Sequence, residues 1–460
     1  MTKPTLLTGL TLAVAQALLL SLGACGGGGG YSSGGGGMAT ATYTVGGSVS
    51  GLTGSGLVLG NGADSLPVSA DGPFTFATKV AAGAGYNVSV ATQPTNPSQT
   101  CSVGSGSGTM GSSNVTNVAV ACTATLANEK LTGAYQVVDF VGDSPFNYEG
   151  DFSDLLTLTF DGAGNFTGTA VENGDGRIYS SPVSGTYAVT VDGTLTIGLS
   201  VGLLGTSPVT GSLSADGNTL VAGQTTASGS QPMLLFAIKQ GQSTFSNASL
   251  TGAYSAVHYD SHSAGDSGGL LAVTFDGSGN FSGTDTLNNA GTVSTVSVAG
   301  TYAVAADGTL MISPAGAAPI TGALSADGTT LLGSQLTSGT FPSVVIGIKR
   351  GQTGFSNADL NGTYRAATFA YNSMGNGGGL YPLTFNGAGS ITGVGVFNSA
   401  GTITSSDKWE GPYTVAADGT LTLSPFEFSP VIGSLSADGN TLLAAQLTAG
   451  QVPEVLVGIK

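Results

Sequence analysis

The chain has 460 residues, of which glycine supplies 77; charged residues make up only 8%, whereas 40% are apolar. This balance argues against a disordered chain, which combines few apolar residues with a high density of charge. Ten Lys and Arg stand against 26 Asp and Glu, so the chain lacks the material for the basic face that nucleic-acid binding needs. With two histidines and three cysteines, we expect no enzyme, no resident metal and no cofactor.

Residues 1–24 have the layout of a secretory signal peptide. Lys3 gives a basic start, and the apolar run at 6–22 is short for a membrane-spanning helix, which needs about 20 apolar residues. The run ends in Leu-Gly-Ala-Cys at 22–25, which resembles the lipobox of bacterial lipoproteins. The resemblance implies cleavage before Cys25 and acyl chains on that residue. An ordinary secretory signal with an incidental cysteine is the alternative.

Residues 25–40 form a Gly- and Ser-rich stretch that is typical of a flexible tether. In the lipoprotein family, Asp after the lipidated cysteine favours retention in the inner membrane, and here Gly26 stands at that position. The resemblance therefore predicts a protein of the bacterial cell envelope, anchored in the outer membrane through the lipid on Cys25. The side of the membrane that it faces is left open.

Residues 41–125 are predicted to form a small β-sandwich. Short strands with alternating polar and apolar side chains, such as 86–90, are separated by turns rich in Gly, Asp and Pro, a pattern typical of sandwiches. The segment resembles the Ig-like or prealbumin-like modules of bacterial surface proteins, which implies a spacer or stalk.

Two cysteines remain for this module once Cys25 carries lipid, namely Cys101 and Cys122. An exported compartment permits disulfides, and closing a loop of about 20 residues contributes roughly 3 kcal/mol in the chain-entropy model. We expect Cys101 and Cys122 to be joined. Two reduced, unrelated thiols are the alternative.

The rest of the chain is one unit repeated three times. The segment Leu-Thr-Gly-Ala-Tyr at 131–135 returns at 250–254 and, as Leu-Asn-Gly-Thr-Tyr, at 360–364, and further landmarks follow in the same order in each copy. Such ordered recurrence is the signature of a repeat architecture. A fragment that holds only the second repeat is expected to fold alone. The repeats span 128–242, 246–352 and 356–460.

Each repeat divides into about eight strands in which side chains alternate between a dry and a wet face, as expected for antiparallel sheets. Asp-Gly turns follow strands two, four and six and fit tight hairpins. We predict an all-β protein in which the sandwich precedes three tandem eight-stranded antiparallel up-and-down barrels. They resemble lipocalin- or avidin-type barrels. Tandem β-sandwiches are the alternative.

In such a barrel the tight turns share one rim, and the connections that differ among the copies share the other, where recognition usually occurs. In the second repeat the first of these variable loops is predicted to hold His258, Tyr259, Asp260, Ser261 and His262. A hydrolase is disfavoured because residues crowded into one loop lack rigid support. Binding of a metal by the two histidines with Asp260 is weighed against a solvated loop.

Two further groups are candidates for binding. Trp409 is either a platform for a sugar or a packed core residue. Glu149, Asp151 and Asp154 form either a cation site or a solvated face. The candidate binding residues are His258, Tyr259, Asp260, His262 and Trp409.

The sequence favours a non-enzymatic role in binding, adhesion or surface structure, with a glycan, a protein or a small molecule as possible partner and no nucleic acid. The alternative is a carrier that holds a small ligand inside the barrels. In the first repeat Gly168 and Ala170 leave room for one, whereas Phe160, Tyr187 and Phe236 would fill the interior. A cavity of several hundred Å³ would favour carriage.

Overall fold

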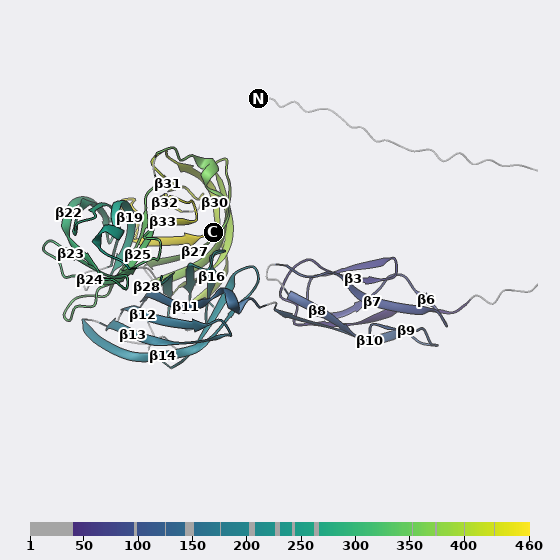
Figure 1. Cartoon of the computed structure of the whole chain (residues 1–460). Coiled ribbons are helices and arrows are strands. Elements are labelled where there is room, and N and C mark those ends of the chain that lie inside the picture. Colours follow the sequence, from purple (N-terminus) through teal and green to yellow (C-terminus); the bar gives the residue numbers. More distant parts are fainter. Residues whose placement is uncertain are drawn as a thin grey trace, which may run out of the picture.

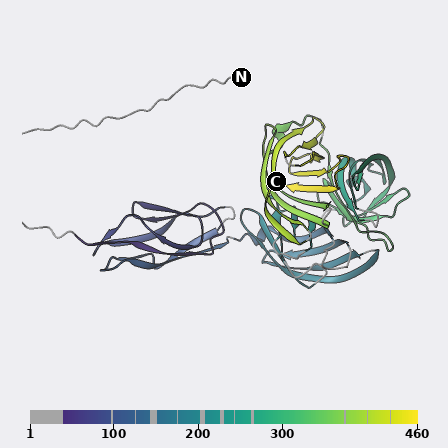
Figure 2. The ribbon, with the colours of Figure 1, turned by 180° about the vertical axis from the view of Figure 1, so that it is seen from behind.

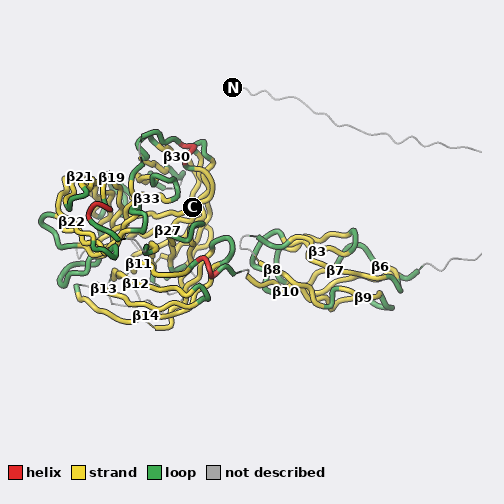
Figure 3. The backbone as a smooth tube through the Cα atoms, viewed as in Figure 1, coloured by secondary structure: helices red, strands yellow, loops and turns green. Residues whose placement is uncertain are grey.

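The computed structural model describes residues 40–95, 99–124, 126–142, 151–174, 176–201, 208–225, 231–241, 244–261, 266–351, 353–372, 375–399, 401–426 and 428–460. Cys25, the signal segment, Glu149 and His262 lie outside these ranges. Strands dominate the described residues, and a short 3-10 turn (Asn128–Lys130, Asn247–Ser249 or Asn357–Asp359) precedes the first strand of each repeat (Figure 3). None of the helices in these ranges is long and apolar enough to cross a membrane. The all-β prediction is confirmed.

The N-terminal module consists of two four-stranded sheets and a short two-stranded pair, and it extends to one side of the barrels (Figure 1). The two larger sheets bury a common core that includes Val45, Leu57 and Val118. One sheet has the order β5 (Gly72–Thr75), β2 (Val45–Ser50), β10 (Val115–Ala124), β8 (Gln99–Gly104), the other β4 (Asp64–Val68), β3 (Leu57–Asn61), β7 (Gly85–Thr92), β9 (Ser107–Thr109), and β1 (Thr42–Tyr43) pairs with β6 (Val80–Ala81).

The predicted disulfide is confirmed. Cys101 on β8 and Cys122 on β10 lie directly opposite each other in the antiparallel ladder, and their sulfurs are bonded. The bond therefore joins two neighbouring strands of one sheet. Whether this module belongs to the Ig-like or prealbumin-like class stays a prediction.

Each repeat forms a closed eight-stranded barrel in which neighbours in sequence are neighbours in the sheet and the first strand pairs with the eighth. The predicted up-and-down barrels are confirmed, and tandem sandwiches are excluded. Barrel 1 comprises β11 (Thr132–Val141), β12 (Phe152–Asp161), β13 (Asn165–Gly174), β14 (Arg177–Val189), β15 (Thr194–Val201), β16 (Val209–Leu213), β17 (Thr219–Gly223) and β18 (Met233–Lys239).

The other barrels repeat this order. Barrel 2 comprises β19 (Thr251–Asp260), β20 (Ser267–Asp276), β21 (Asn280–Asn289), β22 (Thr292–Val304), β23 (Thr309–Pro314), β24 (Ile320–Leu324), β25 (Thr330–Ser334) and β26 (Ser343–Lys349). Barrel 3 comprises β27 (Asn361–Asn372), β28 (Gly375–Asn386), β29 (Ser390–Ser399), β30 (Thr402–Val415), β31 (Thr420–Leu423), β32 (Val431–Leu435), β33 (Thr441–Ala445) and β34 (Glu454–Ile459).

The tyrosine of the opening motif closes the tight-turn end of every barrel. In barrel 1 the Tyr135 hydroxyl donates to the carbonyl of Gly217, in the turn between strands six and seven. Tyr254 and Tyr364 make the same bond in the other barrels. Each phenol satisfies a turn carbonyl that burial would otherwise leave unpaired, so the repeated motif seals this end of the barrel interior.

The three barrels also share a hydrophobic core outside their interiors, which we call the central core. It is built mainly from the outward faces of strands one, seven and eight of each repeat. The rings of Phe140, Tyr259 and Phe369, each nine residues after its repeat's opening leucine, meet edge to face with centroids 4.9 to 5.0 Å apart. The three barrels lie close together in both views (Figures 1 and 2).

The central core corrects two expectations. The division into one dry and one wet face fails on these strands, where both faces are buried. Phe236, which we expected to fill the interior of barrel 1, points outward into the central core. A fragment with a single repeat would expose this apolar face to water, so its independent folding stays a prediction.

Buried asparagines join the barrels in a ring. Asn173 of barrel 1 donates to the carbonyls of Gln335 and Thr340 in barrel 2 at 2.7 and 3.2 Å. Asn288 of barrel 2 does the same in barrel 3, and Asn398 of barrel 3 returns to barrel 1. Each barrel therefore braces the connection between strands seven and eight of its neighbour, at the rim with the variable loops.

Candidate ligand-binding site

Barrel 2 encloses a cavity of about 680 Å³. Its floor is apolar and lies toward the tight turns, where Phe275 and Phe281 contribute aromatic rings. Its mouth lies at the rim with the variable connections, between residues 317–318 and 339–343. Asn173 of barrel 1 anchors that second segment, so the neighbouring barrel helps to shape the mouth.

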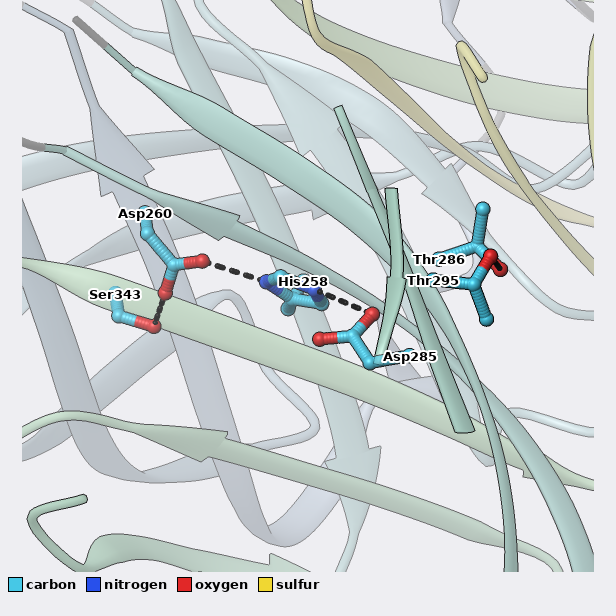
Figure 4. A network of polar contacts seen from close by, with 6 residues as sticks. All are labelled: His258, Asp260, Asp285, Thr286, Thr295 and Ser343. Carbon is cyan, nitrogen blue, oxygen red and sulfur yellow. Dashed lines mark hydrogen bonds and ion pairs between the residues drawn. The ribbon is translucent and has the colours of Figure 1, made fainter. Parts of the chain in front are cut away.

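A network of charged side chains lines this cavity. The imidazole of His258 on β19 lies between two carboxyl groups, with Nδ1 2.6 Å from Oδ2 of Asp260 and Nε2 3.2 Å from Oδ1 of Asp285 on β21. Ser343 on β26 donates its hydroxyl to Oδ1 of Asp260. These four side chains approach one another from three strands (Figure 4), whereas Thr286 and Thr295 form a separate exposed pair.

A glycine makes room for the imidazole. Gly269 on β20 lies directly opposite His258, and a Cβ atom at this position would lie 2.4 Å from Nε2 of His258 and 2.9 Å from Oδ1 of Asp285. Distances this short are steric overlaps, so an alanine would displace the buried network. The glycine is needed here for space.

The charge state of His258 follows from this geometry. Burial by itself lowers the pKa of the imidazole, but the negative charge and hydrogen bond of Asp260, with Asp285 on the other side, overcome it and raise the pKa to about 10. His258 is therefore an imidazolium at neutral pH. The imidazolium faces two carboxyl groups, of which that of Asp260 is the closer.

The arrangement differs from a hydrolytic triad. A catalytic serine must pass its proton to the imidazole, whereas Ser343 donates to Asp260 and both imidazole nitrogens face carboxyl groups. Among the described residues, no group of three or more His, Cys, Asp and Glu is arranged to hold a metal ion. The network is better suited to binding a polar group than to activating a nucleophile.

Barrel 3 fills the space that barrel 2 leaves open. Trp409 on β30 is only 3% exposed and packs in the interior against Tyr381, with ring centroids 5.8 Å apart. The register places Val298 and Leu271 of barrel 2 at the equivalent positions. Barrel 2 therefore has smaller side chains at the two positions that aromatic rings occupy in barrel 3.

Barrel 1 differs from the other two barrels because it buries three neighbouring carboxyl groups. Asp139 on β11 lies opposite Asp154 on β12, which in turn lies opposite Glu172 on β13, and all three are buried. Burial raises the pKa of Asp139 to about 7 and that of Asp154 well above its usual range, with the negative charge of Glu172 adding to both. The expected solvated face is therefore wrong for Asp154 and also for Asp151, which is buried against Asn376.

The predicted site residues have separate places in the structure. His258 and Asp260 lie within strand β19, where Asp260 pairs with Ser267 and Ser343, so their expected position in a loop is wrong. Tyr259 points outward into the central core. Trp409 is buried inside barrel 3, and His262 lies outside the described residues.

Sequence reasoning missed Asp285, Ser343 and Gly269. Asp285 is 27 residues from His258 and reaches it only across the intervening strand. One signal was present in the sequence: the equivalent interior positions of the other repeats hold Ala170 and Gly395, so a lone charged residue there was unusual.

No protein-family model matches the chain, and no curated protein matches it. Among solved structures it is similar to transferrin binding protein B of Neisseria meningitidis, with 10% identity and a TM-score of 0.21 over 72% of this chain and 77% of that one. It is also similar to a protein of unknown function of the DUF3598 family from Nostoc punctiforme, with 12% identity and a TM-score of 0.17 over 48% of this chain and 97% of that one. Similarity this weak carries no conclusion about function.

Proposed function

We propose that this is a non-enzymatic, lipid-anchored protein of the bacterial cell envelope that binds a small molecule inside its second barrel. The observation that carries the proposal is the cavity of about 680 Å³ in barrel 2, with its apolar floor and the charged network of His258, Asp260 and Asp285. Ligand sites are typically concave, of several hundred Å³, mostly apolar, and lined by a few convergent polar groups.

The cavity favours carriage of a small molecule over adhesion as the role of barrel 2. A packed barrel would offer a partner only its surface, as barrel 3 does with Trp409 inside. The polar network also supports a binding role, because buried charges are costly unless they are paired. Here the imidazole of His258 is paired with two carboxyl groups, and all three side chains line the cavity.

A second candidate is adhesion through the rim of barrel 3. Phe426 and Phe428, between β31 and β32, are 76% and 43% exposed, and the ring of Phe428 stacks on Trp409 with centroids 6.0 Å apart. Exposed aromatic side chains that cluster at one place are typical of contact surfaces. Replacement of both phenylalanines by serine would then abolish adhesion and leave ligand binding in barrel 2 intact.

The cavity is tested with N-phenyl-1-naphthylamine, an uncharged probe that fluoresces in apolar surroundings. We expect the intact protein to bind it, and Val298→Trp, which copies Trp409 of barrel 3 into barrel 2, to abolish the binding. Ser297→Trp adds the same bulk on the exposed face of the same strand and should leave binding unchanged. A probe that binds Val298→Trp as tightly as the wild type would refute the site.

The anchor is tested separately. Cys25→Ala is expected to move the protein from the membrane fraction to the soluble fraction. Stable anchoring needs more than one acyl chain, and this variant lacks the thiol to which the lipid would be attached. Mass spectrometry of the wild-type N-terminus should show the added lipid. A variant that stays in the membrane fraction would contradict lipidation at Cys25.

A further inference from the structure

We infer that the ligand of barrel 2 is an amphipathic amine, whose protonated amino group pairs with Asp285 and whose apolar body lies on the aromatic floor of the cavity. This inference rests on the proposed function and specifies its ligand. Its basis is the unequal pairing of the two carboxyl groups around His258 and the division of the cavity into polar and apolar parts.

The two carboxyl groups are not equally satisfied. Asp260 lies 2.6 Å from Nδ1 of His258 and also accepts from the hydroxyl of Ser343. Among the described residues, Asp285 has a single hydrogen-bond partner, Nε2 of His258, at the longer distance of 3.2 Å from Oδ1. Asp285 also lines the cavity, so its carboxyl group is the one with acceptor capacity left for a ligand.

The sign of the charge selects the head group. The imidazolium lies closer to Asp260 than to Asp285, so a cationic head group beside Asp285 would pair with that carboxyl group in a place where unpaired charge is expensive. An ammonium group brings several donors and no acceptor, which matches a carboxylate whose lone pairs are not all used by donors. A carboxylate ligand would bring a second acidic group beside Asp285, and an alcohol would form only a hydrogen bond without charge pairing.

The cavity also requires an apolar body on the ligand. Toward the tight turns the lining includes Val273, Phe275, Phe281 and Leu331, which offer no hydrogen bonds from their side chains. Burial of apolar ligand surface against them favours binding. A small hydrophilic amine would use the network but leave the floor unfilled, whereas an alkyl or aryl amine would fill both parts.

Competition against the bound N-phenyl-1-naphthylamine tests the inference with decylamine, decanol and decanoate, which share one alkyl chain and differ in the head group. We expect decylamine to displace the probe at a concentration roughly tenfold or more below that of decanol, because the ammonium adds charge pairing to the hydrogen bond that the alcohol can also form. Decanoate should be the weakest. Equal competition by the amine and the alcohol would overturn the inference while leaving the proposed cavity site intact.

Asp285→Asn identifies the group responsible. It should remove the preference for decylamine over decanol, because the amide keeps the size of the side chain and loses its charge. The affinity of each variant for the probe is measured first, so that the competition constants of the variants can be compared. Asp307→Asn, an exposed position in a turn of the same barrel, is the matched control and should keep the preference. Failure of the probe to bind the wild-type protein would instead refute the proposed function itself, and retention of the preference in Asp285→Asn would refute the role of Asp285.

Discussion

Barrels 2 and 3 share strand order, register and the tyrosine-closed end, yet one is hollow and the other is filled. The difference lies in a few inward positions near the variable rim, where side chains in one barrel are small or charged and in the other are large and aromatic. It shows that closure of the barrel depends on the tight-turn end and the central core, which leaves the open half of the interior free to vary. The paired positions are Val298 and Trp409, Leu271 and Tyr381, and Asp285 and Gly395.

The largest effect should come from the central core, on which both barrels depend. Phe369→Ala removes one of the three rings at the centre of the assembly and should lower the free energy of unfolding by about 3–5 kcal/mol, the usual cost of such a truncation in a core. Chemical denaturation measures it. Phe426→Ala, at an exposed position of the same barrel, should change stability by less than about 0.5 kcal/mol; equal losses would show that the central core adds little.

The contrast between the barrels should be reversible. Trp409→Val is expected to open barrel 3, at a cost of about 2–4 kcal/mol for the cavity created, and to add a second binding site for N-phenyl-1-naphthylamine. Titration of the probe gives the number of sites. Trp409→Phe leaves most of the volume filled and should add no site. If Trp409→Val binds no additional probe, side-chain volume at this position does not explain the hollow interior.

The charged network of barrel 2 should depend on the absence of a side chain at Gly269. Gly269→Ala is expected to push the imidazole of His258 away from Asp285 and to cost about 1–3 kcal/mol, the usual penalty of overpacking. The neighbouring Gly268→Ala points to the other face, where no atom comes closer than 3.4 Å, and should be nearly neutral. Thermal unfolding of both variants decides the matter, and equal shifts would mean that space beside His258 is not limiting.

The smallest effect is a pH dependence confined to barrel 2. The pKa of His258 is about 10 in the folded protein against 6.5 for the free side chain, so its stabilisation is complete below about pH 6.5 and is lost as pH rises through the folded value. Relative to His258→Gln, the wild type should therefore lose roughly 1 kcal/mol between about pH 7 and pH 8. Denaturation curves of both proteins over this range measure the difference in their free energies of unfolding. A difference that does not change with pH would show that Asp260 and Asp285 do not raise the pKa of His258.

Much of the fold follows from local signals in the sequence. The repeated landmarks, the Asp-Gly turns and the alternation of side chains predict three closed antiparallel barrels, and parity of the cysteines predicts the disulfide between Cys101 and Cys122. The central core also left a trace, since Met233 to Ile238 is apolar without alternation, as in strands buried on both faces. This apolar run does not show which surface covers the strand, because any apolar face could bury it.

The candidate site is different in kind. The sequence singled out His258 and Asp260 because they stand in a short segment that combines histidine, aspartate and serine, but it could not supply Asp285 or Ser343, which approach from other strands. By itself the sequence determined strand pairing, because hydrogen-bonded neighbours follow one another along the chain and turn chemistry fixes the register. Only the tertiary structure decided which side chains share an interior and how much space remains there, because a cavity depends on the summed volumes of residues that the barrel brings together from all around its wall.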